Sequence, residues 1–249
     1  AAAVRQATLA IRSGEINTAL VVGVEKMTDA VGTDVTTAIA GGADSDWELA
    51  HGLTAPAIAA LIMRRYMYEY SVPTDGLSGF SVNAHKNAST NSYAMFRNLI
   101  SSEQYSRGAM VSSPVNVFDS APDADGAAAL VITSSDRELV EGRTIQIAAS
   151  NLTTDSLAIH DREDLLTFSA AETSARYAYD QAGIDSNDID VAEIYDRFGV
   201  YAAMSLEACG FASQGSGWEM SQNGSVSLQG SLPISTFGGL KARGNPGGA

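Results

Sequence analysis

The 249 residues carry a formal net charge of −14, with 15 Lys and Arg against 29 Asp and Glu. A surface this acidic repels nucleic-acid phosphates, which excludes nucleic acid as an expected partner. A hydrophobic content of 45% and a charged content of 18% are typical of a globular chain with a substantial core rather than a disordered one. No apolar run is long enough to span a bilayer and no signal-peptide pattern is found, so we expect a cytoplasmic protein.

Helical and strand patterns alternate in the first half of the chain. Residues 1–13 carry apolar side chains at helical spacing, and residues 19–24 form a continuous apolar run that predicts a strand buried on both faces. A Ser-, Asn- and Gly-punctuated stretch follows, in which we predict helices at residues 47–53, 56–70, 78–88 and 101–105. Residues 127–132 return to strand character, so the pattern predicts an α/β fold.

The second half follows a polar connection at residues 136–142, which we interpret as the domain boundary. Strands are predicted at residues 145–149 and 191–194, and helices at 170–182 and 200–209. The tetrapeptide Tyr195-Asp196-Arg197-Phe198 comes directly after the second of these strands. Active groups of α/β sheets gather at such carboxyl ends, so the tetrapeptide is a candidate site.

The glycine loop, defined here as residues 238–249, reads GGLKARGNPGGA. Five glycines and a proline disfavour a regular helix or strand. Backbone amides without side chains in front of them suit a phosphate, an oxyanion or a thioester carbonyl. We therefore expect the loop to approach a ligand closely.

Several motifs recur in chain order along almost the whole sequence: GVEKMTD at 23–29, MRRYMYEY at 63–70, NAHKNAS at 83–89, DGAAA at 125–129, DVAEI at 190–194 and GGLKxxG at 238–244. Together they resemble the thiolase superfamily, in particular its archaeal and sterol-carrier-type members. The resemblance implies two layered α/β halves with an inserted, mainly helical loop domain. It assigns residues 1–135 to a partial N-terminal domain, with the insertion at about 25–115, and residues 143–249 to a truncated C-terminal domain, in a fragment lacking both termini.

The resemblance also implies site residues. The family's nucleophilic cysteine is expected just upstream of Ala1, whereas Cys209, the single cysteine, reads as a buried structural thiol. Two family histidines are replaced, one by Tyr195 in the HDCF-like motif and one by Asn245 in the GHP-like motif. The candidate catalytic residues are Tyr195, Asp196 and Asn245, and no metal ligands are expected. The candidate residues for binding coenzyme A (CoA) are Gly238, Gly239, Lys241, Gly244, Gly247 and His85.

Three functions stay open at this point. The first is thiolase-type acyl transfer on CoA thioesters, without a covalently bound cofactor. The second is a retro-aldol cleavage of β-hydroxyacyl-CoA, typical of superfamily members with a YDxF motif, in which Tyr195 takes the hydroxyl proton beside Arg197 or Lys241 while Asn245 and the glycine loop hold the thioester oxygen in a common cavity. The third is a non-catalytic acyl-CoA-binding subunit. The implied partners are acyl-CoA, further copies in a dimer or tetramer, and a small zinc-ribbon and oligonucleotide-fold protein that helps to hold CoA.

Overall fold

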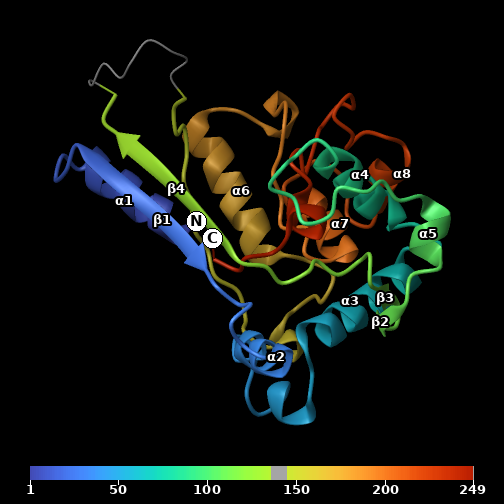
Figure 1. The fold of residues 1–249 in the computed structure, drawn as a ribbon. Helices are drawn as coiled ribbons and strands as arrows, with labels where there is room; N and C mark the ends of the chain where they lie inside the picture. The colour runs from blue at the N-terminus through green and yellow to red at the C-terminus, as the bar shows by residue number, and fades with distance from the viewer. Residues whose placement is uncertain (136–144, 249) are drawn as a thin grey trace.

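The computed structural model describes residues 1–135 and 145–248. Helix α1 (Ala2–Arg12) lies against a two-stranded antiparallel sheet formed by β1 (Thr18–Glu25) and β4 (Gly126–Thr133), as Figure 1 shows. The register runs from Thr18 opposite Thr133 to Glu25 opposite Gly126. Both strands and the helix therefore lie where the sequence predicts them.

Strand β1 is not buried on both faces, and that prediction is wrong. Its exposure alternates along the strand, and Leu20, Val22 and Val24 are exposed on the same face. A continuous apolar run indicates that a strand is apolar on both sides, but it does not say which element covers each side. Helix α1 covers one face of the strand pair within the part of the chain that the structure describes.

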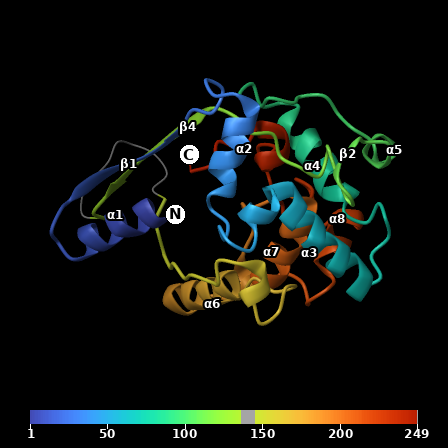
Figure 2. The same ribbon diagram turned by 90° about the horizontal axis from the view of Figure 1, so that it is seen from below.

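The remaining elements form a mainly helical body beside this strand pair (Figures 1 and 2). Its helices are α2 (Gly32–Ala40), α3 (Ala55–Glu69), α4 (Ser78–Ala88), α5 (Ser102–Ser106), α6 (Ser169–Ala182), α7 (Gly199–Ala208) and α8 (Gly217–Gln222). Short helical turns are η1 (Leu49–His51), η2 (Ile159–Asp161), η3 (Ser186–Asp188) and η4 (Gly239–Arg243), the last of π type. A small antiparallel sheet pairs β2 (Met110–Ser112) with β3 (Val115–Asn116). None of the described helices is both long and apolar enough to cross a membrane.

Helix α7 is the centre of the hydrophobic core. It contacts α3, α4, α6 and α8, and seven of its ten residues are buried. A helix that is apolar all round must be surrounded by other elements, which explains its central place. Its side chains pack with those of α3 and α4, including Ile62, Met63 and Phe80.

Some predicted elements are absent or different. Residues 145–149 have no regular secondary structure, and in the stretch 191–194 only Ala192 forms a β-bridge, to Ile234. A strand needs a neighbour that exchanges hydrogen bonds with it, and β-propensity alone does not supply one. The predicted helix at 47–53 is reduced to η1, while α2, α8 and the β2–β3 sheet were not predicted. The predicted boundary at 136–142 lies outside the described residues.

We expect Leu206→Ala, in α7, to lower the free energy of unfolding by about 2–5 kcal/mol, because Leu206 is fully buried and its truncation leaves a cavity. The matched control is Leu61→Ala in α3, whose side chain is 46% exposed and whose loss should change stability by about 0.5 kcal/mol or less. Urea denaturation of both variants checks this. Equal effects would contradict the placement of α7 at the centre of the core.

Candidate functional site

Asp196 joins the tetrapeptide 195–198 to the glycine loop. Its carboxylate is buried, accepts the backbone N–H of Leu240 at 2.8 Å and accepts the hydroxyl of Ser235 at 2.8 Å. The first N–H groups of a helical turn have no partner within the turn, so a carboxylate at η4 satisfies one of them. Asp196 therefore holds the start of η4 in place.

Lys241, in the same turn, is buried with Asp196 and Asp119. Its ammonium donates to the main-chain oxygen of Asp119, whose carboxylate accepts the hydroxyl of Tyr105 at 2.7 and 2.8 Å. Burial raises the pKa of both carboxyls, and Lys241 opposes that rise. Burial lowers the pKa of Lys241, and the two carboxylates oppose that fall. The three groups form a buried charge cluster, named here the Asp119–Lys241–Asp196 cluster.

Two glycines of the loop are required by this packing itself. Gly238 and Gly239 have φ values of +107° and +54°, in the left-handed region that favours glycine. A Cβ on Gly239 would lie 1.9 Å from Oδ2 of Asp196, and one on Gly238 would lie 2.6 Å from Cβ of Ala88. The close approach predicted for the loop is thus made to the protein's own side chains at these positions.

Asn245 is buried beside the segment 122–124. Its N–H donates to the carbonyl of Pro122 at 2.8 Å, and its carbonyl accepts from Ala124 at 3.1 Å. The side-chain Oδ1 accepts the N–H of Gly247 at 3.4 Å, whereas Nδ2 has no hydrogen bond within the described residues. Asn245 therefore keeps one amide donor free for an acceptor.

His85 lies on the inner side of α4. Its ring is buried, Nδ1 is 3.1 Å from the carbonyl oxygen of Asn98, and the ring stacks on Phe96 at a centroid distance of 6.0 Å. Phe118 meets the ring edge-on, and burial lowers the pKa of the imidazole. The contacts with Phe96, Phe118 and the carbonyl of Asn98 explain why the ring of His85 is buried here. Its assignment to CoA binding stays a prediction.

A largely apolar cavity of about 370 Å³ opens beside the tetrapeptide. Tyr195 lines it, is 51% exposed, and stacks on Tyr201 at a centroid distance of 6.3 Å. Tyr201, in α7, meets the ring of Phe198 edge-on at a centroid distance of 5.2 Å, and both residues line the cavity together with Arg197. Burial raises the pKa of Tyr201 to about 12, with Tyr195 adding to the rise.

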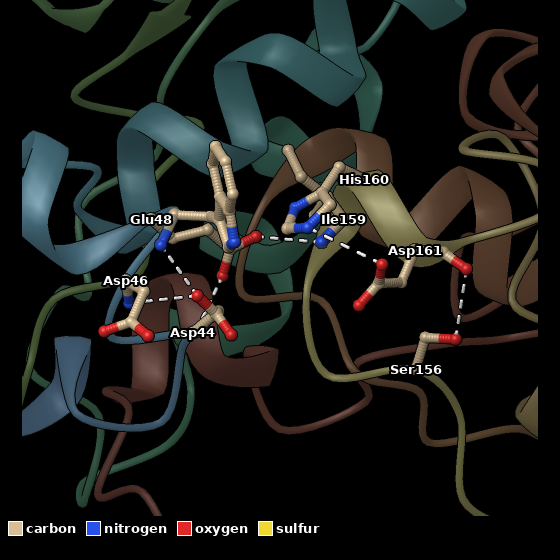
Figure 3. Close-up of polar contacts among 8 residues, drawn as sticks. Asp44, Asp46, Glu48, Ser156, Ile159, His160 and Asp161 are labelled. Carbon is tan, nitrogen blue, oxygen red and sulfur yellow. Dashed lines mark hydrogen bonds and ion pairs between the residues drawn. The ribbon is translucent and has the colours of Figure 1, made fainter.

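Glu48 also lines this cavity, and Figure 3 shows its polar contacts. Its Oε1 accepts the N–H of Ile159 at 2.8 Å and its Oε2 accepts the N–H of Asp44 at 2.9 Å. Trp47 and His160 make an edge-on ring contact at 5.8 Å beside these bonds. Glu48 therefore ties the loop before η1 to η2, two segments that lie 111 residues apart in the sequence.

The predicted site residues thus fall into two groups. Asp196, Gly239 and Lys241 come together in the buried cluster, whereas Tyr195 lines the cavity. Asn245 is not among the described residues that line that cavity, so the expected common cavity for Tyr195 and Asn245 is not found.

An ion pair connects the two places. Arg197 Nη2 lies 3.3 Å from Oδ1 of Asp123, and Asp123 forms a β-bridge with Asn245. Arg197 lines the cavity as well, so it marks the shortest connection through named contacts between Tyr195 and Asn245.

Sequence reasoning missed Glu48, Arg162 and Tyr201, which line the cavity. No local sequence pattern indicates these three residues, because segments far apart in the chain form the cavity. Cys209 is only half-buried, at the end of α7, and burial raises the pKa of its thiol. A thiol held in its neutral form is a poor nucleophile, which agrees with the structural role predicted for it.

We expect Lys241→Met to lower the free energy of unfolding at pH 7 by about 3–5 kcal/mol, because it leaves two buried carboxyls without their cation. Both carboxyls have a pKa raised by burial, so their cost to stability appears as the pH rises above their unfolded pKa. The deficit should therefore shrink towards pH 4. Denaturation at several pH values checks this, with the exposed Arg243→Met as control. A deficit independent of pH would contradict the cluster.

Residues 1–113 match the thiolase N-terminal domain and residues 152–249 match the thiolase C-terminal domain-like family. The acetyl-CoA acetyltransferase of Methanothermobacter thermautotrophicus is 37% identical over 99% of this chain and 64% of that protein. The 17-hydroxy-3-oxo-4-pregnene-20-carboxyl-CoA lyase of Mycobacterium tuberculosis is 29% identical over 80% of this chain and 53% of that protein.

The fold is also similar to that of a solved structure. The solved Ltp2-ChsH2(DUF35) aldolase superposes with a TM-score of 0.84 at 26% identity, covering 96% of this chain and 63% of that one. The chain spans 64% of the length of the archaeal acetyltransferase it matches. Two family domains in the expected order and a thiolase-like α/β fold, matched from end to end, show that this chain belongs to the thiolase superfamily.

Proposed function

We propose that the protein acts on acyl-CoA thioesters and makes or breaks a carbon–carbon bond next to the thioester carbonyl. Family membership supports the class of substrate and reaction. The observation that carries the proposal is the cavity beside the tetrapeptide 195–198, which Tyr195 lines with its ring stacked on Tyr201. The resemblance to thiolases assigns Tyr195 to the position of a family histidine. Apolar walls with a few polar groups suit an acyl chain, and no covalently bound cofactor is invoked.

Acyl transfer is the first form of this reaction, and likeness to the archaeal acetyltransferase supports it. The cysteine thiolate would attack the 3-oxo carbon of a 3-oxoacyl-CoA, and the Cα–Cβ bond would break to release acetyl-CoA as an enolate that takes up a proton. The acyl group left on the cysteine would then pass to the thiol of CoA, which frees the cysteine. The resemblance to thiolases assigns that thiolate to a residue just upstream of Ala1. Cys209, whose thiol pKa is raised by burial, is not proposed for this role.

We expect a protein that carries this upstream cysteine to consume acetoacetyl-CoA in the presence of CoA, and we expect iodoacetamide to stop the reaction. Loss of the thioester-enolate absorbance measures the reaction. The Cys209→Ala variant is the control and should retain activity, since its thiol has no role in transfer. Activity that survives iodoacetamide would contradict cysteine-dependent acyl transfer.

Cleavage of a β-hydroxyacyl-CoA is the second form, and the character of the cavity favours it. Among the described residues that line the cavity there is no histidine and no cysteine, while Tyr195 and Tyr201 are both present. Tyr195, as the general base, would take the β-hydroxyl proton, and the bond between Cα and Cβ would break to release an aldehyde or ketone. The electron pair stays on the acyl-CoA as an enolate, which regains the proton at Cα.

The thioester oxygen needs donors while it carries the enolate charge. The acyl group would lie in the cavity and the thioester would point past the Arg197–Asp123 ion pair towards the glycine loop. Asp196 and Lys241 would hold that loop rather than contact the substrate.

We expect Tyr195→Phe to slow aldehyde or ketone release about 100-fold or more, because it removes the proton acceptor and leaves the ring stacked on Tyr201. The control is Tyr177→Phe, an exposed tyrosine on α6. Carbonyl trapping with a hydrazine, measured with the melting temperature of each variant, checks this. Unchanged release in Tyr195→Phe would contradict the cleavage mechanism.

Assembly is proposed by analogy. The DUF35 component named in the solved aldolase supports a small partner subunit for this chain. Dimers or tetramers are proposed as well, and the exposed apolar face of β1 and β4 supports an interface at that sheet. A non-catalytic acyl-CoA-binding subunit stays the outcome if neither reaction is detected.

A further inference from the structure

Residues 30–53, which lie between β1 and α3, are not held by the hydrophobic core. This stretch, named here the 30–53 segment, contains α2 and η1, and Figure 1 shows α2 at the lower edge of the helical body. Every residue of the segment is described, and of them only Ala40 and Glu48 are buried. None of them belongs to the hydrophobic clusters that the described residues form. A stretch with so few buried contacts opens more readily than the core beside it.

The segment nevertheless has an internal structure of its own. α2 is a regular helix, and the turn before η1 is closed by the N–H of Leu49, which donates to the carbonyl of Asp44 at 2.9 Å. Oδ1 of Asp44 accepts the N–H of Trp47 at 2.7 Å, and Oε2 of Glu48 accepts the N–H of Asp44. These bonds all lie within the segment, so it can move as a unit without losing them.

The chain on either side of the segment is fixed. Before it, the N–H groups of Met27 and Thr28 donate to Oδ1 of Asp125 at 2.7 and 3.0 Å. After it, α3 packs in the core through Ile62 and Met63. A unit with its own structure between two fixed ends is the arrangement of a hinged lid.

Two contacts join the segment to η2. Oε1 of Glu48 accepts the N–H of Ile159 at 2.8 Å, and among the described residues this is the only hydrogen bond between the segment and any residue outside 27–53. The ring of Trp47 meets that of His160 edge-on, although Trp47 is 66% exposed. A single hydrogen bond to a carboxylate changes an equilibrium by about tenfold or more, so it favours a closed form and still allows opening.

The segment contributes to the cavity lining as well. Ile39, Ala43 and Leu53 line the cavity, together with Tyr195 and Tyr201 of the helical body. An acyl chain in the cavity would contact apolar side chains of both parts. A ligand that contacts both parts binds the closed form more tightly than the open one and so shifts the protein towards closure.

We propose that the 30–53 segment is a lid, that it opens to admit the acyl group of the substrate and closes over it, and that Glu48 is the positioning residue that holds it closed through Ile159. The inference rests on the proposed function in one respect, that an acyl thioester enters this cavity. Closure excludes water while the carbon–carbon bond next to the thioester carbonyl is made or broken.

The experiment measures a distance between the lid and the helical body. Spin labels are attached to Ala38→Cys, exposed on α2, and to Asp180→Cys, exposed on α6, which packs on α7. Cys209→Ala removes the native thiol, and double electron–electron resonance gives the distances and their populations. We expect one main distance in this protein and a second one in Glu48→Ala, with a ratio of open to closed form that is about tenfold higher or more.

Two further variants test the role of the Glu48 side chain. Glu48→Gln keeps one acceptor oxygen and should lie between the parent protein and Glu48→Ala. Asp46→Ala is the matched control, because it removes the same charge from the same turn, while the Asp46 carboxylate is exposed and bonds only to Ser45 among the described residues. It should leave the distances unchanged. Melting temperatures verify that each variant is folded.

Closure over the acyl group is tested in Glu48→Ala with hexanoyl-CoA, which has no 3-oxo or β-hydroxyl group to react. We expect hexanoyl-CoA to restore the closed distance, and CoA alone to leave the second distance in place. Calorimetry measures the binding of each compound.

A single distance in Glu48→Ala, or a broad distribution without a defined second distance, would overturn the lid. An equal effect of Asp46→Ala would overturn the assignment to Glu48. Binding of hexanoyl-CoA without closure, or closure by CoA alone, would overturn closure over the acyl group. A failure of the proposed function gives a different result: hexanoyl-CoA would not bind, while a second distance in Glu48→Ala would still support the lid and its Glu48 contact.

Discussion

The Asp119–Lys241–Asp196 cluster is the interaction on which the rest of the site depends. Burying one cation between two carboxyls is unfavourable unless each charge has a partner, and here each has one. The cluster fixes η4 and the glycine loop on one side and the tetrapeptide 195–198 on the other. Because Asp196 cannot move without uncovering a buried charge, its neighbours Tyr195 and Arg197 are held at the cavity.

The cavity itself depends on a second long-range tie. Glu48 accepts hydrogen bonds from Ile159 of η2 and from Asp44 in the loop before η1 (Figure 3), so these two segments, both of which contribute to the lining, are held together. The result is a largely apolar space with Tyr195, Arg162 and Arg197 in its lining. Such a space can bind an acyl chain and orient it, which is the general requirement for chemistry next to a thioester carbonyl.

Much of the fold could be predicted from local patterns. Apolar periodicity indicated α1, α3, α4, α6 and α7 to within one or two residues, and the two longer strands were found from their composition. The strands predicted at residues 145–149 and 191–194 are not found, because a strand needs a hydrogen-bonding partner that the local sequence does not identify. The prediction that β1 is buried on both faces is wrong for a similar reason. Which face of a strand is covered depends on how the layers pack, and the sequence of the strand does not determine that.

The candidate site divides in a similar way. Tyr195, Asp196 and the glycine loop were found because a strand end and a run of glycines are visible locally, and family resemblance named the replaced histidines. Arg162 and Glu48 were missed because segments more than a hundred residues apart in the sequence come together to form the cavity that they line. The glycines were predicted to face a ligand, yet at Gly238 and Gly239 they face Ala88 and Asp196. Sequence identified the loop, and only the structure shows what it approaches.

The most direct measurement of the central claim is a crystal structure of the protein with a bound, non-cleavable acyl thioester analogue. The account expects density for the acyl chain in the cavity between Tyr195 and Arg162, with the thioester oxygen on the side of Asn245. An acyl chain bound elsewhere, for example on the exposed face of β1 and β4, with the cavity holding only solvent, would contradict it.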